Sequence, residues 1–283
     1  MLGAHAADQM ENFELRDRYL HEIEHLPQKQ QLSRHLLLAE SALSRRDYPT
    51  AAQNLEAAAK INSNLSRLVR LQLRYAFDHG DAADVLAKAE KLVKAGAIND
   101  YEAEQYQNWA YRRLLSEVTD AGSLKACLKR IPESLKSGEL CVAIAEKCER
   151  LGLYAEAVKW VKTYYPQTRQ PELLEAFVES VRFLSEREQQ KAIDLADSWL
   201  QEQPDNAPLL MYLGQLAYGR KLWGKAQGYL EASIALQPSV SAHLVLARVF
   251  DETDQPQKAQ EQRNLVLESV AEEEHPAALP QPN

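Results

Sequence analysis

The sequence has few of the residues that interrupt helices. Only 10 of its 283 residues are glycine and 12 are proline. Runs of β-branched residues bounded by turns are absent, which disfavours a sheet. Ala, Leu, Glu, Gln, Lys and Arg are abundant instead, and these residues favour helices. The composition therefore predicts an all-α protein.

Cysteines and long apolar runs are also scarce. The three cysteines, Cys127, Cys141 and Cys148, are an odd number without a CxxC motif, so we expect reduced thiols in a cytoplasmic setting and not a disulfide framework. No run approaches the ~18 apolar residues that span a bilayer. The first residues lack the basic and apolar regions of a leader peptide. We therefore expect the chain as given to be soluble.

The sequence has fewer basic than acidic residues. Lys and Arg number 33 and Asp and Glu number 41, which gives a net charge of −8. No basic stripe with interleaved aromatic residues is visible, and a negative chain repels phosphate backbones. Nucleic acid is therefore not an expected partner.

A pattern of small and apolar residues stands out between Ala207 and Ser239. In order it comprises Leu210, Leu213, Gly214, Ala217, Ala226, Leu230 and Pro238. This spacing resembles the tetratricopeptide repeat, a pair of antiparallel helices about 34 residues long. Gly214 and Ala226 are small enough for the two helices to approach closely, and Pro238 cannot continue a helix.

The small residue of the second helix recurs along the chain. Ala157, Ala192, Ala226 and Ala259 lie 35, 34 and 33 residues apart, and Pro204 follows Ala192 as Pro238 follows Ala226. The period predicts repeats at about 138–172, 173–206, 207–239 and 240–271.

The N-terminal half follows the same pattern less regularly. A further repeat is predicted at about 32–65 around Ala51, and Ala83 is the next candidate for the small residue. The period is lost between Ala83 and Ala157, where residues 101–137 are predicted to form a degenerate pair. We expect one right-handed α-solenoid of antiparallel helix pairs over residues 1–271, followed by a disordered, acidic and Pro-rich tail over 272–283.

Several stretches resemble the C-terminal repeat region of the HemY family, inner-membrane proteins of proteobacteria associated with haem biosynthesis. They are Ala4-His5-Ala6-Ala7, Leu15-Arg16-Asp17-Arg18-Tyr19-Leu20, Leu36-Leu37-Leu38-Ala39-Glu40-Ser41-Ala42-Leu43, Tyr212-Leu213-Gly214-Gln215-Leu216 and Trp223-Gly224-Lys225-Ala226. The resemblance implies two N-terminal membrane helices that this chain lacks, with the repeats at the cytoplasmic face of the inner membrane. It implies late haem-biosynthesis enzymes as partners, and haem or porphyrin as a ligand.

The front of the chain fits that expectation. Residues 13–20 read as the second helix of a pair, and residues 4–10 are short for its partner, so we expect residues to be missing upstream. A flavin-dependent protoporphyrinogen oxidase shares the short name of the family in some bacteria. That enzyme needs a GxGxxG loop, which this sequence does not contain.

Binding residues follow from the resemblance to the repeat fold, in which fixed positions of each first helix face a concave groove. Those positions hold Leu36, Glu40, Leu43, Leu68, Gln72, Tyr75, Val142, Glu146, Glu149, Phe177, Val181, Leu184, Met211, Gln215, Tyr218 and Arg248, and Tyr106, Tyr111 and Arg112 of the middle helix are added. The mixture suits a peptide or a helix. The apolar members could equally complete the core between repeats.

Other candidate groups are explained better by packing or solvation. His21-Glu22-Ile23-Glu24-His25 matches the zinc-peptidase motif HExxH, but no third ligand is identifiable and a solvated helix face is favoured. Cys141 and Cys148 share a helix face and read as core residues. His35 and His243 occupy a packing position, although either could be a haem ligand.

The sequence thus predicts a non-enzymatic scaffold with no catalytic residue, no metal and no required cofactor. The alternatives are a haem or porphyrin carrier and a generic peptide-binding adaptor. A zinc peptidase is the least favoured alternative.

Overall fold

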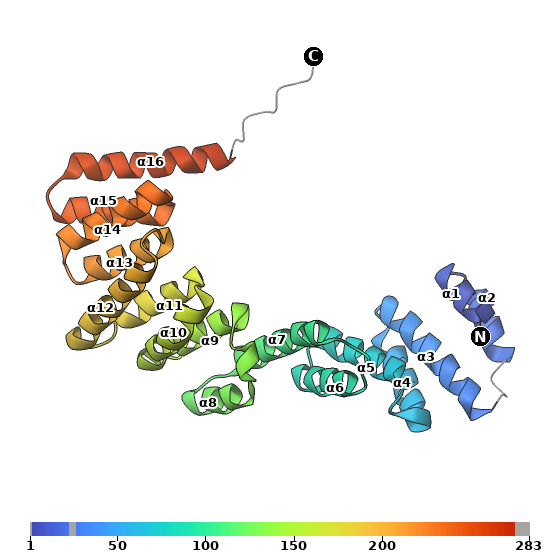
Figure 1. The fold of residues 1–283 in the computed structure, drawn as a ribbon. Helices are drawn as coiled ribbons and strands as arrows, with labels where there is room; N and C mark the ends of the chain where they lie inside the picture. Colours follow the sequence, from blue (N-terminus) through green and yellow to red (C-terminus); the bar gives the residue numbers. More distant parts are fainter. Residues whose placement is uncertain (1, 23–26, 275–283) are drawn as a thin grey trace, which may run out of the picture. The chain divides into compact units, whose positions relative to one another are not determined.

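A computed structural model describes residues 2–22 and 27–274 (Figure 1). Its described residues form α-helices joined by short turns, with one 3₁₀ turn and no strand. The predicted all-α solenoid class is confirmed. Consecutive helices pack against one another along most of the chain.

The chain divides into two compact units, Met1–Val118 and Thr119–Asn283. The helices of unit 1 are α1 (Leu2–Gln9), α2 (Phe13–Glu22), α3 (Gln28–Ser44), α4 (Tyr48–Asn62), α5 (Ser66–His79), α6 (Ala82–Lys94) and α7 (Asp100–Glu117). Those of unit 2 are α8 (Ala121–Arg130), the 3₁₀ turn η1 (Glu133–Leu135), α9 (Gly138–Arg150), α10 (Tyr154–Thr168), α11 (Pro171–Val181), α12 (Glu186–Glu202), α13 (Ala207–Gly219), α14 (Trp223–Leu236), α15 (Val240–Glu252) and α16 (Pro256–Glu274). In the pairs α3–α4, α5–α6, α9–α10, α11–α12, α13–α14 and α15–α16 the odd-numbered helix is the first and the even-numbered helix is the second. Helix α7, which ends unit 1, is also called a first helix.

The boundary of the two units falls between α7 and α8, inside the predicted degenerate pair 101–137. The single solenoid expected over residues 1–271 stays a prediction. Helix α7 ends where Val118 takes an extended conformation, and α8 spans only 10 residues before the irregular stretch around η1. The helix pair α5–α6 lies in a region where the sequence pattern predicted no complete repeat. At the other end α16 extends to Glu274, into the predicted tail, and residues 275–283 lie outside the described chain.

Side-chain caps place several helix starts. The Asp47 carboxylate accepts a hydrogen bond from the Thr50 amide at the start of α4. Asp120 and Ser123 form a reciprocal capping box on α8, and Ser185 and Glu188 form one on α12. Each cap satisfies amide groups that a helix leaves unpaired in its first turn.

Small residues lie where the helices of a pair cross. Ala51, Ala157, Ala226 and Ala259 have no exposed surface. At Gly214 in α13 an added Cβ would lie 2.6 Å from Cγ of Leu230 in α14. Any side chain larger than hydrogen at this position would therefore displace the buried Leu230 side chain or α14 itself.

Two of the alanines predicted at helix crossings, Ala83 and Ala192, do not lie at the same point of their helices as the others. Ala83 is exposed, and the fully buried Val85 occupies the corresponding place one turn into α6. Ala192 is buried, but α12 begins at Glu186, almost two turns before it, whereas α10 and α14 begin about one turn before their alanines. The pair α11–α12 is therefore displaced along the sequence relative to the alanine period.

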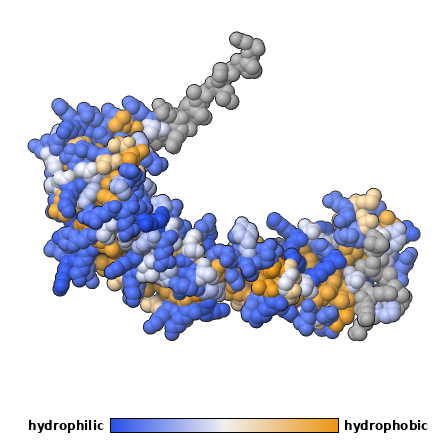
Figure 2. All heavy atoms as spheres, in the orientation of Figure 1, coloured by the Kyte–Doolittle hydropathy of each residue, from blue (hydrophilic) through white to orange (hydrophobic). Residues whose placement is uncertain are grey.

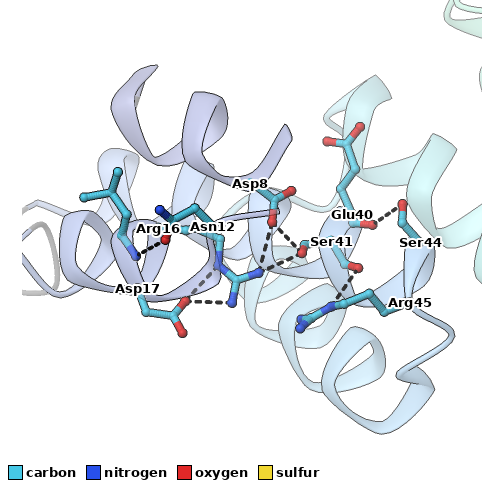
Figure 3. Close-up of polar contacts among 9 residues, drawn as sticks. Asp8, Asn12, Arg16, Asp17, Glu40, Ser41, Ser44 and Arg45 are labelled. Atoms are coloured by element: carbon cyan, nitrogen blue, oxygen red, sulfur yellow. Dashed lines mark hydrogen bonds and ion pairs between the residues drawn. The ribbon is translucent and has the colours of Figure 1, made fainter. Parts of the chain in front are cut away.

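A buried ion pair attaches the first helix pair to α3 (Figure 3). The Arg16 guanidinium lies 3.0 Å from the Asp8 carboxylate and donates a 2.8 Å hydrogen bond to Oγ of Ser41. Ser41 in turn donates to Asp8 over 2.6 Å. Arg16 is only 4% exposed, so its charge depends on these partners and on Asp17 for compensation.

Replacing Gly214 by alanine tests the close crossing. We expect Gly214→Ala to lower the free energy of unfolding by about 1–3 kcal/mol, because the new methyl group overpacks against the buried Leu230. The matched control is Gly228→Ala in α14, where an added Cβ meets nothing within 4 Å. That change should stabilise the helix by about 0.5–1 kcal/mol. Urea unfolding of both variants checks the pair, and equal effects would contradict the crossing geometry.

Candidate functional site

The first helices of unit 2 bring one row of polar and apolar side chains together. Helix α11 packs against both α9 and α13. The side chains between and beside these helices that keep some exposure are Val142, Glu146, Glu149, Glu172, Glu175, Glu179, Met211, Tyr212 and Gln215. We call this set the acidic face.

The carboxylates of the acidic face lie close enough to affect one another. Burial raises the pKa of Glu149, and the charges of Glu179, Glu146 and Glu175 raise it further. Burial together with the charges of Glu175, Glu172 and Glu179 raises the pKa of Tyr212 to about 12. The face therefore concentrates negative charge on adjacent helices.

Only part of this charge is neutralised within the chain. Glu146 pairs with Arg150 at 3.1 Å, and Glu179 pairs with Arg182 at 2.8 Å. Among the described residues, Glu149, Glu172 and Glu175 make no ion pair. These three carboxylates are available to a cation brought by a partner.

Apolar groups lie beside the carboxylates. A slot of about 190 Å³ opens beside α13, lined by Met211, Tyr212, Pro171 and Pro208 among others. The Gln215 amide donates to the Met211 sulfur over 3.0 Å, which orients the thioether. The face can therefore offer both charge and a place for an apolar side chain.

Some of the residues predicted to line a groove belong to the acidic face on α9 and α13, but none does on α11. Val142, Glu146 and Glu149 on α9, and Met211 and Gln215 on α13, keep partial exposure. On α11 the predicted Phe177 and Val181 are 1% and 2% exposed and belong to the core. Because α11 begins at Pro171, before the predicted repeat boundary, the exposed row holds Glu175 and Glu179 instead. The proline at the helix start was the available signal.

Unit 1 differs because its first helices neutralise one another. Arg67 of α5 pairs with Glu40 of α3 at 2.6 Å, and Arg70 pairs with Glu102 of α7 at 3.4 Å. Arg74 follows them on the exposed side of α5. Apolar side chains gather over the α4–α7 part of unit 1 in the view of Figure 2.

Of the residues predicted to line a groove in unit 1, Leu68 and Tyr111 are buried in the core. Tyr75 stacks on His79 with ring centroids 4.1 Å apart, and Gln72 is partly exposed beside it along α5. Tyr106 contacts the ring of Phe77, which also meets Trp109 at 4.4 Å. The pattern did not identify Phe77 or Trp109, because neither falls on the assumed groove positions.

The remaining predicted groove residues are scattered. Leu36 and Leu43 are buried and Leu184 is partly buried. Arg112 and Arg248 are exposed, and Tyr218 packs its ring 5.4 Å from that of Trp223.

The histidines considered as haem ligands are held by their own helix pairs. Nδ1 of His35 lies 2.9 Å from Oδ1 of Asn54, and Nδ1 of His243 lies 2.7 Å from Oε1 of Gln262. Asn54 donates through its amide nitrogen to Thr50, so its oxygen accepts from the protonated Nδ1 of His35. Both rings thus join a first helix to its second helix.

The metal candidates gain no support from the described residues. His21 and Glu22 end α2, while residues 23–26 of the HExxH motif lie outside the described chain. No group of three or more His, Cys, Asp or Glu that could hold a metal occurs within the described ranges. Cys141 and Cys148 are buried free thiols, and burial raises the pKa of each to about 11.

Comparison with known proteins adds little beyond the architecture. No known family model matches this chain, and no curated protein does. Among solved structures it is similar to the MamA protein, with 16% identity and a TM-score of 0.40 over 72% of this chain and 100% of MamA. It is also similar to the human IFIT1 dimer with PPP-AAAA, with 19% identity and a TM-score of 0.41 over 93% of this chain and 66% of IFIT1. Yeast Tom70 matches with 11% identity and a TM-score of 0.35 over 95% of this chain and 68% of Tom70. Similarity this low says nothing about what this chain binds.

None of the helices in the described ranges combines the length and apolar character that crossing a membrane requires.

The raised pKa of Glu149 predicts how the stability of the fold changes with pH. Its pKa is higher in the folded chain than its ordinary value of 4.5, so the folded state holds a proton that the unfolded state has already lost. The free energy of unfolding must then fall as pH rises through this window. We expect Glu149→Gln to raise the melting temperature at pH 7, with the gain disappearing in more acidic buffer below that ordinary value. Thermal melts across pH check this, with the exposed Glu261→Gln on α16 as control, and a gain independent of pH would contradict it.

Proposed function

We propose that this chain is a non-enzymatic scaffold whose acidic face binds a basic, partly apolar segment of a partner protein. The observation that carries the proposal is the juxtaposition of three unpaired glutamates, Glu149, Glu172 and Glu175, with Met211 and Tyr212 on adjacent first helices.

Charge selects the sign of the partner. A lysine or arginine placed over Glu172 and Glu175 would offset their negative charges, and it would relieve the repulsion between Glu175 and Glu149. The same charges would repel an acidic segment, so the acidic face would bind basic segments in preference to acidic ones.

Shape favours an extended or helical segment. The face runs across successive first helices, so contacts repeat along it. An amphipathic helix presents basic and apolar groups at spacings of three and four residues, which matches alternating carboxylates and apolar side chains. The slot beside Met211 and Tyr212 would take one apolar side chain of the partner.

The resemblance to the HemY family narrows the proposal. On that basis the partners would be late haem-biosynthesis enzymes, gathered at the cytoplasmic face of the bacterial inner membrane through N-terminal helices outside this chain. Haem or porphyrin binding is the alternative that the same resemblance supports.

Reversing two charges of the acidic face tests the proposal directly. We expect a fluorescein-labelled amphipathic peptide of lysine and leucine to bind saturably, and Glu172→Lys with Glu175→Lys to weaken it at least about tenfold. The control is Glu261→Lys with Glu268→Lys, which reverses two exposed glutamates on α16. Fluorescence anisotropy measures the affinity of the parent chain and of both double variants for the peptide. A second peptide, with glutamate in place of each lysine, serves as the control for the sign of the charge.

Binding of the glutamate peptide with equal affinity, or equal weakening by both double variants, would overturn the proposal. A fall in affinity with added salt should accompany specific binding, because exposed charge interactions are screened.

Haem titration separates the scaffold from the carrier. For a scaffold we expect no saturable one-to-one change in the Soret band with the whole chain, and no difference in a His35→Ala, His243→Ala variant. Saturable binding that this variant abolishes would establish the carrier instead. If the narrower proposal is right, co-purification with a tagged form of this protein from bacterial cells should enrich late haem-biosynthesis enzymes.

A further inference from the structure

A second hollow lies on the other set of helices of unit 2. A cavity of about 550 Å³ opens between α8 and α10, and it shares no residue with the acidic face. Leu124 and Leu128 of α8 form one wall, and Trp160 and Tyr164 of α10 form the other. Leu153, in the turn before α10, completes the apolar lining. Its volume falls within the roughly 300–1,000 Å³ of small-molecule sites.

The aromatic wall is held in place by hydrogen bonds. The Trp160 indole donates over 3.1 Å to the Cys141 carbonyl, and its ring lies 4.3 Å from that of Tyr164. The Tyr164 hydroxyl donates over 2.7 Å to the Glu133 carboxylate. Since the polar atoms of both rings are already satisfied, the wall presents apolar ring surface to the cavity.

The lining also contains a buried thiol. Cys148 lines the cavity, and burial raises its pKa to about 11. The thiol is therefore neutral near pH 7 and behaves as a small apolar group.

Charge is confined to the rim. Lys125 of α8 and Lys159 of α10 line the opening, are exposed and have no ion-pair partner among residues 2–22 and 27–274. One carboxylate, Glu156, faces them from α10, so the rim carries an excess of one positive charge. An apolar interior beneath two unpaired ammonium groups suits an apolar molecule with one anionic end.

We propose that this cavity binds a small amphiphilic carboxylic acid, with its apolar body against Leu124, Leu128 and Trp160 and its carboxylate at Lys125 and Lys159. The site is separate from the acidic face because the two share no residue, although α9 contributes Cys148 to the cavity and Glu146 and Glu149 to the acidic face. The chain would then combine a partner-binding surface with a separate small-ligand site.

Matched ligands test the chemistry of the site. The whole chain is titrated calorimetrically with 1-naphthylacetate, its neutral amide and 1-naphthylmethylamine. We expect saturable binding in the order carboxylate, amide, amine, and quenching of tryptophan fluorescence by the carboxylate, because Trp160 lines the cavity. Equal binding of the carboxylate and the amine, or no saturable binding of the carboxylate, would overturn the proposal.

Matched variants locate the site. We expect Lys125→Gln with Lys159→Gln to weaken naphthylacetate binding roughly five- to tenfold, as loss of two exposed charge interactions predicts. Lys129→Gln with Lys162→Gln removes two exposed lysines of the same helices outside the lining and should change nothing. Glu156→Gln should tighten binding, and Thr163→Trp, at an exposed lining position, should block the cavity.

Equal effects of the two lysine pairs would place the ligand elsewhere and overturn the assignment. The variant Glu172→Lys with Glu175→Lys should bind naphthylacetate as the parent chain does, so that failure of either proposal leaves the other testable.

Discussion

The close approach of two helices at each crossing is the constraint from which the rest of the molecule follows. Buried alanines at Ala51, Ala157, Ala226 and Ala259, and Gly214 against Leu230, let the helices of a pair pack without a gap. Tight pairs in turn bring successive first helices side by side. Only then do side chains far apart in the chain, such as Glu149 and Glu179, act on one another.

The same architecture produces different surfaces in the two units. In unit 1, arginines of α5 pair with Glu40 and Glu102 on neighbouring first helices. In unit 2, Glu175 and Glu179 of α11 act on the carboxylate of Glu149 on the neighbouring α9. Charges on neighbouring first helices are therefore paired at Arg67 and Arg70 in unit 1, whereas like charges meet at Glu149 and Glu175 in unit 2. A repeat fold can vary these exposed positions freely, because they contribute little to the stacked core.

Departures from the regular repeat coincide with the second candidate site. Helix α8 is short, and the stretch after it contains η1 instead of a direct turn into α9. The cavity lies beside this short helix, between Leu124 and Leu128 of α8 and Trp160 and Tyr164 of α10. The part of unit 2 in which the sequence period is lost thus also holds the second candidate site.

The sequence by itself determined the helical class, most helix pairs and the small residues of their crossings, because composition and spacing are local properties. It also indicated Val142, Glu146 and Met211. Only the tertiary structure showed that the chain divides after Val118. Only it showed that α11 buries Phe177 and Val181 and exposes Glu175 and Glu179 instead. When a helix begins two residues earlier, the residues at its fixed positions rotate by about 200° around the helix axis. The packing of α11 against α9 and α13 determines which of its faces is buried. The unpaired charges and the cavity beside α8 likewise depend on contacts between helices that no local spacing records.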